Sequence, residues 1–155
     1  MPVDVLLHGE MGHRLYAARG AVKATASLSN DLNNDDEDTW LTVKLDVKDG
    51  WHINANKPLQ DNLIPTELII NENDEDWTLG EVEYPEPIKR RLDFQQAELA
   101  LYEGKIELKA RLMHKNFPPE KNVVMPQLKL QACNKNLCLP PETLAFRIIT
   151  GKIGY

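Results

Sequence analysis

The sequence predicts an all-β fold, namely an immunoglobulin-like antiparallel β-sandwich. Three segments alternate apolar and polar residues with a period of two, which is typical of strands that bury one face. Polar segments rich in Asn, Asp, Glu and Pro separate the predicted strands, as turns do. Roughly seven short strands joined by such turns favour two packed sheets. The alternating segments are 41–47, 106–112 and 128–132.

Other segments are less regular, but they also favour strands. Their residues are apolar or β-branched, and polar turn residues flank each of them. Residues 95–103 are ambiguous, because their side chains also favour helix. The further strands are expected near residues 22–29, 66–71, 77–84 and 143–149.

The first twenty or so residues differ from the rest of the chain. Met11–Arg19 could form a short helix with Leu15 and Tyr16 as its apolar positions, and a glycine follows it as a stop signal. We therefore expect residues 1–21 to be a linker or the tail of a preceding domain, outside the sandwich. Residues 22–155 are expected to form the domain itself.

Composition and charge exclude several classes of function. The 155 residues are 42% hydrophobic and 27% charged, which is enough apolar material for the core of one domain. The 18 Lys and Arg against 24 Asp and Glu give a net charge of −6, which makes a nucleic-acid partner a poor fit. We expect no membrane segment and no signal peptide, because the apolar runs are short and Asp4 interrupts the first of them. The chain could still be a fragment of a longer exported protein.

The sequence predicts neither a metal site nor a cofactor. Two cysteines cannot complete a structural zinc site, and no histidine stands at ligand spacing from another histidine or from a cysteine. The motifs of phosphate-binding loops and of common hydrolases are also missing. The four histidines are His8, His13, His52 and His114.

The two cysteines are the only group of residues in the sequence that indicates a particular chemistry. A predicted strand ends at Cys133, four residues follow, and Cys138 opens the return strand. Asn134 and Asn136 suit tight or left-handed turn positions. Cysteines facing each other across such a turn have Cα atoms about 4.5–5.5 Å apart, and a disulfide tolerates about 4.4–6.8 Å. The spacing therefore permits a disulfide.

A bond across so short a loop contributes little stability. Its entropic contribution falls below the roughly 3 kcal/mol of a 15-residue loop. A short bond in a turn is better suited to opening and closing than to holding the fold together. A plain structural staple and two unused thiols remain alternatives from the spacing alone.

Several segments resemble the N-terminal domain of the thiol:disulfide interchange protein DsbD. The most specific likeness is Gln131-Ala132-Cys133 followed by Cys138-Leu139-Pro140-Pro141-Glu142-Thr143, which is similar to the family's active-site hairpin. The resemblance covers about residues 22–150, although this hairpin has four residues between the cysteines where well-known members have five. Asn54 also stands where the family often has an aromatic residue. Weaker likenesses lie in 50–58, 84–87 and 102–104.

The resemblance implies a redox-active domain of a protein-disulfide reductase that works outside the cytoplasm, in the periplasm. Such a domain takes electrons from a thioredoxin-like domain and passes them to periplasmic thiol–disulfide proteins, including those of cytochrome c biogenesis. It needs no cofactor, and we expect a monomer. Cys138 is expected to bond to the partner, because the prolines after it leave an irregular, open strand. Cys133 is expected to resolve the mixed disulfide.

The resemblance also implies residues around the cysteine pair. The family carries a cap loop with a Phe over the disulfide, which places Phe94 there, with Asp93 beside it and Tyr102 nearby. A core position is the alternative for Phe94. His52 is expected near the pair, where it would tune the pKa of a thiol. A histidine without a redox role is its alternative.

Two other functions remain open from the sequence. One is an immunoglobulin-like binding or accessory domain whose disulfide is only a structural staple. The other is a structural domain appended to an unrelated enzyme, with residues 1–21 as the connector. A redox titration separates them from an exchange domain, because a staple resists reduction.

Overall fold

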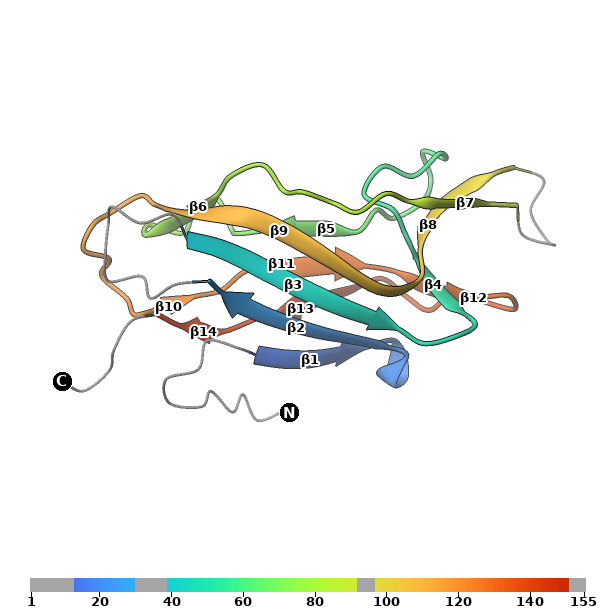
Figure 1. Ribbon diagram of the computed structural model, residues 1–155, viewed down its shortest axis with the longest axis horizontal. Helices are drawn as coiled ribbons and strands as arrows, with labels where there is room; N and C mark the ends of the chain where they lie inside the picture. Colours follow the sequence, from blue (N-terminus) through green and yellow to red (C-terminus); the bar gives the residue numbers. More distant parts are fainter. Residues whose placement is uncertain (1–12, 30–38, 92–96, 151–155) are drawn as a thin grey trace.

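The computed structural model describes residues 13–29, 39–91 and 97–150, which form an antiparallel β-sandwich (Figure 1). One layer is a five-stranded sheet that lies over a three-stranded sheet, and both follow the long axis of the molecule. The five-stranded sheet has the order β1 (His13–Ala17), β2 (Val22–Leu28), β3 (Thr39–Val47), β9 (Gly104–His114) and β6 (Trp77–Leu79). The three-stranded sheet has the order β13 (Glu142–Ala145), β11 (Gln127–Leu130) and β5 (Glu67–Ile69).

Two smaller sheets close the ends of the sandwich (Figure 1). The larger one, which we call the end sheet, has four strands and carries the cysteines. Its order is β12 (Ala132–Asn134), β4 (Trp51–Asn54), β8 (Leu99–Tyr102) and β7 (Ile88–Arg90). At the opposite end, β10 (Val123–Val124) pairs with β14 (Ile148–Ile149).

The period-two segments are strands that face the core, as predicted. On β3 the alternate residues from Leu41 to Val47 are at most 2% exposed. They are paired in register with β9, where Leu108 is fully buried. Leu128 and Leu130 of β11 belong to the same buried cluster. The core therefore lies between the five-stranded sheet and the three-stranded sheet, where the alternation placed it.

The helix predicted over residues 11–19 is wrong for most of its described part, and only a short 3-10 helix, η1 (Ala18–Gly20), overlaps its end. His13–Ala17 is strand β1, which pairs along its whole length with β2. Leu15 and Ala17 are buried and Tyr16 is 57% exposed, which is a strand alternation. Pairing with the free edge of β2 outweighs the weak local preference for helix. Part of the segment expected to precede the sandwich thus belongs to its first sheet.

The remaining expected strands are present in shorter form. Within 66–71 and 77–84, strands β5 and β6 are three residues long. The segment 143–149 is divided between β13 and β14. The ambiguous segment 95–103 contains β8, so its described part is a strand rather than a helix. Within the described ranges, no helix has the length and apolar character that crossing a membrane requires.

Candidate redox site

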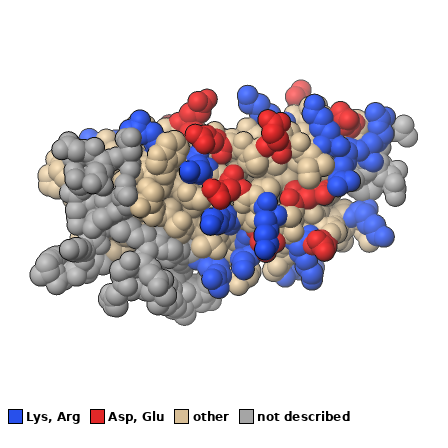
Figure 2. Space-filling model, viewed as in Figure 1, with Lys and Arg blue, Asp and Glu red and all other residues tan. Residues whose placement is uncertain are grey.

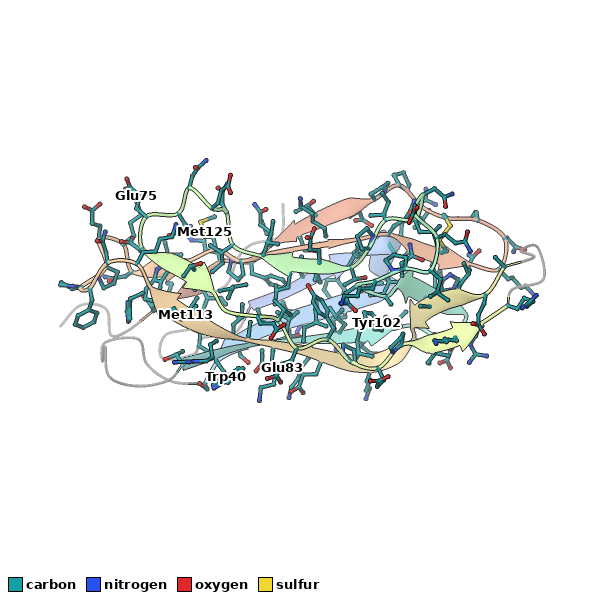
Figure 3. The ribbon with its side chains drawn as sticks, turned by 90° about the horizontal axis from the view of Figure 1, so that it is seen from above. Trp40, Glu75, Glu83, Tyr102, Met113 and Met125 are labelled. Atoms are coloured by element: carbon teal, nitrogen blue, oxygen red, sulfur yellow. A yellow bond between two sulfur atoms is a disulfide. The ribbon has the colours of Figure 1, made fainter. Side chains whose placement is uncertain are left out.

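Cys133, on the edge strand β12 of the end sheet, is joined by a disulfide to Cys138 in the arm that follows, and Figure 3 draws a disulfide as a yellow bond. Their Cα atoms are 4.0 Å apart, which is closer than the spacing predicted. The two residues also form an antiparallel bridge. Backbone bonds flank it on both sides, from Asn134 N–H to the Leu137 carbonyl at 2.8 Å and from Leu139 N–H to the Ala132 carbonyl at 2.9 Å. The hairpin therefore has a hydrogen-bonded frame of its own.

The Asn134 side chain closes the turn. Its Oδ1 accepts the N–H of Asn136 at 2.8 Å and that of Leu137 at 2.9 Å. Neither asparagine has a positive φ, so the left-handed conformation suggested for them is not used. Gln131 Nε2 donates to the Leu139 carbonyl at 3.1 Å and ties the two arms together. An asparagine at this position thus serves as a side-chain acceptor for turn amides.

The two cysteines differ in exposure. Cys133 is 5% exposed on strand β12, whereas Cys138 is exposed in the irregular return arm. Leu137 is 48% exposed beside it, and Pro140 is exposed two residues later. Cys138 is therefore the more exposed residue of the disulfide, and an apolar side chain adjoins it.

The turn between β1 and β2 holds the chain that follows Cys138. The N–H of Ala18 donates to Glu142 Oε2 at 2.7 Å, across 124 residues of sequence. Ala18 and Arg19 have φ values of 54° and 56°, which non-glycine residues rarely adopt. Leu139 lies with them around a small cavity of 230 Å³. Sequence reasoning missed this contact, because no local pattern pairs residue 18 with residue 142.

His52 lies directly beside the buried cysteine. On the end sheet, strand β4 pairs with β12 so that His52 is opposite Cys133. Side chains at directly opposed positions share one face of a sheet, with Cβ atoms about 4.5–5.5 Å apart. His52 is 6% exposed, and its burial lowers the pKa of its imidazole, while Glu103 raises this pKa and Arg90 lowers it. The structure thus brings together His52 and the cysteine pair.

An open cleft of about 510 Å³ adjoins the hairpin. Its wall includes Trp51, His52 and Lys135, together with Arg90 and Glu103. Arg90 binds Glu103 through two hydrogen bonds, of 2.8 and 3.0 Å. Figure 2 shows Lys and Arg side chains gathered at the end of the molecule that carries β7 and β12, with acidic side chains among them. Among the described residues, no three His, Cys, Asp or Glu side chains are grouped so that they could hold a metal ion.

Tyr102 lies on the other face of the end sheet. It pairs with Ile53 on strand β4, and both residues belong to the hydrophobic core (Figure 3). Its hydroxyl donates to Asn56 Oδ1 at 2.6 Å and accepts the Asn56 N–H at 3.2 Å. Since successive strand residues face opposite sides, Tyr102 and Cys133 lie on opposite faces. The structure does not bring Tyr102 to the disulfide.

Asn54, where the family often has an aromatic residue, is 3% exposed. Its side-chain Nδ2 donates to the Ile64 carbonyl at 2.8 Å, and its backbone carbonyl accepts the Thr66 hydroxyl at 2.6 Å. Asn54 thus fastens the long connection after β4 to the end sheet. The expected cap residues Asp93 and Phe94 lie outside the described residues, in the connection between β7 and β8.

A β-sandwich that carries a hairpin disulfide with one exposed and one buried cysteine fits the class of thiol–disulfide exchange domains. Comparison with known families agrees. Residues 21–149 match the family described as thiol:disulfide interchange protein DsbD, N-terminal, and the chain belongs to this family.

Solved structures support the fold assignment. The N-terminal periplasmic domain of ScsB from Proteus mirabilis matches with a TM-score of 0.63 and 11% identity, over 91% of this chain and 52% of that one. This chain thus spans about half of the ScsB domain. The reduced N-terminal domain of DsbD from Neisseria meningitidis matches with a TM-score of 0.52 and 16% identity, over 91% and 94% of the two chains. At these identities the likeness concerns the fold. No match was found among curated proteins.

Proposed function

We propose that this chain relays electrons between a thioredoxin-like domain and partner proteins outside the cytoplasm, using Cys133 and Cys138 as its redox pair. The observation that carries the proposal is the asymmetric hairpin, in which an exposed cysteine is bonded to a buried one. Membership of the DsbD N-terminal family supports it. The periplasm is the proposed location, and thiol–disulfide proteins, including those of cytochrome c biogenesis, are the proposed acceptors.

The proposed mechanism uses two successive exchange steps. A thiolate of the reduced donor attacks Cys138 Sγ, and a donor–Cys138 disulfide forms as the Cys133–Cys138 bond breaks. Cys133 leaves as a thiolate with the electron pair. The second cysteine of the donor, as a thiolate, then attacks the sulfur of the donor's first cysteine in the mixed disulfide. Cys138 is released as a thiolate. The donor ends as a disulfide and this domain as a dithiol. Passing electrons to an acceptor reverses the order, with Cys138 attacking and Cys133 resolving.

A redox titration tests the function. The protein is equilibrated in glutathione or thioredoxin buffers, and the fraction of free thiol is measured by alkylation and mass spectrometry. We expect a midpoint near the poise of exchange proteins, about −180 to −270 mV. A midpoint below about −300 mV, with slow exchange, would identify the bond as a structural staple.

Trapping tests the roles of the two cysteines. A thioredoxin-like donor that lacks its resolving cysteine is oxidised to an activated mixed disulfide and mixed with each single-cysteine variant. Cys133→Ala leaves the accessible Cys138 and should accumulate a covalent complex, whereas Cys138→Ala should accumulate much less. Equal trapping by both variants would remove the assignment of roles. Trapping by neither would count against exchange itself.

A further inference from the structure

We propose that His52 accepts and donates the proton of Cys133 during exchange, with the Arg90–Glu103 ion pair as its electrostatic partner. The inference rests on the proposed exchange function and adds to it a route for the proton. It begins from the register of the end sheet, where Cys133 on β12 lies opposite His52 on β4. Both residues are buried, at 5% and 6% exposure.

The exposed Cys138 can exchange its proton with water directly, but the buried Cys133 needs a neighbouring group for this. When the disulfide opens at Cys138, Cys133 becomes a thiolate in a site that water scarcely reaches. An unpaired buried charge is costly, so it must be neutralised or bound to a donor. The imidazole on the neighbouring strand is the nearest titratable group that the sheet pairing provides. A histidine can supply the proton and take it back near neutral pH.

The cleft beside the hairpin connects His52 to solvent. His52 belongs to the cleft wall, whereas Cys133 does not. His52 therefore borders the open cleft and, through the strand pairing, Cys133. A proton that enters from the cleft can reach His52 and pass to Cys133, and the reverse path is available when Cys133 must attack.

The charges around His52 act on it in opposite directions. Burial lowers the pKa of His52, Glu103 raises it and Arg90 lowers it. Because Arg90 and Glu103 are bound to each other, their effects partly cancel. Burial is the largest of these effects, so the net pKa of His52 is lowered, which favours the neutral imidazole in the oxidised protein. A thiolate on Cys133 adds a negative charge beside it and raises its pKa, so that proton uptake accompanies reduction. The other charged residues along the cleft are Lys48, Asp49 and Lys135.

The proton balance is simple. During opening, His52 takes a proton from the cleft water, and the imidazolium gives it to the Cys133 thiolate, which leaves a thiol and a neutral imidazole. During closure, neutral His52 removes the proton from the Cys133 thiol, and the thiolate attacks Cys138 Sγ in the mixed disulfide. The partner's sulfur leaves with its electron pair. Solvent then receives the proton from His52, and no other reactant is needed.

The first test follows the His52 ring by NMR as pH is varied, in the oxidised and the reduced protein. In the reduced protein we expect the His52 ring signal to show a second titration step at the pH where Cys133 ionises, and in the oxidised protein, where Cys133 cannot ionise, we expect this step to be missing. In both states Glu103→Gln should lower the midpoint of the imidazole titration, and Arg90→Gln should raise it. A ring titration without that second step in the reduced protein would overturn the proposal, because a histidine with a merely structural role does not sense the thiolate.

The second test measures Cys133 alone, in the Cys138→Ala variant, by the ultraviolet absorbance of its thiolate across pH. With His52→Gln added, we expect the thiolate fraction at neutral pH to fall about tenfold. His114→Gln is the matched control, because the His114 ring packs against Trp77 with the ring centroids 4.5 Å apart. It follows Met113, which lies towards the other end of the molecule (Figure 3). Equal titrations with and without His52 would overturn the proposal.

These readouts separate this inference from the exchange function. Neither test uses a partner protein. If His52 and Cys133 are coupled but neither cysteine variant traps a partner, the exchange function is refuted and the proton route is retained. Normal trapping without coupling would refute the proton route alone. If His52→Gln fails to fold, Glu103→Gln and Arg90→Gln, which alter partly exposed side chains, still decide the question through the NMR midpoint.

Discussion

Reduction of the disulfide should weaken the domain only slightly. The bond joins residues five positions apart, so the closed loop is very short. The loop-entropy relation then gives a stabilisation of about 2 kcal/mol. For a chain of this length, that corresponds to a fall in Tm of roughly 4–8 °C. The hairpin keeps its frame when the bond opens, because Asn134, Gln131 and the flanking backbone amides hold it by hydrogen bonds.

Thermal unfolding followed by circular dichroism, with and without a strong reductant, measures this difference. The double variant Cys133→Ser/Cys138→Ser is the control, since its Tm should not respond to the reductant. A fall well beyond this range, or loss of a cooperative transition, would show that the bond holds the sandwich together. The entropic argument and the exchange function would then both be undermined.

Substitutions at three further positions probe the surroundings of the hairpin. Phe94→Ala should speed the reaction of the cysteine pair with small oxidants and reductants while changing stability modestly. A cost of about 3–5 kcal/mol without faster reaction would place Phe94 in the core. Glu142→Ala removes the acceptor of the Ala18 N–H and should cost about 1–2 kcal/mol in urea unfolding, and Glu142→Gln should cost less. Tyr102→Phe loses the bond to Asn56 and should cost about 1 kcal/mol by the same measurement, with the redox midpoint unchanged.

The sequence predicted well those features that depend on local alternation. Leu41, Val43 and Leu45 alternate with polar residues, and burial of one face follows from that pattern alone. The cysteine hairpin was also predictable, because both of its arms and its turn lie within a few residues of each other. Its family resemblance is confirmed by the match over residues 21–149.

Contacts between distant segments could not be predicted in this way. His52 was expected near the cysteine pair, but no local pattern fixes that place. It is about eighty residues from Cys133 in the chain, and a shift of one residue in the pairing of β4 with β12 would put the two on opposite faces. The strand at His13–Ala17 depends on the edge of β2, which no local propensity reveals. The family resemblance placed Tyr102 near the disulfide, but the alternation of β8 turns it towards the core.

The first strand has a practical consequence for any shortened version of this protein. The family match begins at residue 21, but the sheet begins at His13. A protein cut at the family limit would lack β1, and the backbone amides and carbonyls along one side of β2 would have no partners. Such open edges recruit strands from other molecules. The cut would also delete Ala18 and its bond to Glu142, close to Cys138. Redox measurements on such a fragment would then describe a self-associating species with a loosened hairpin.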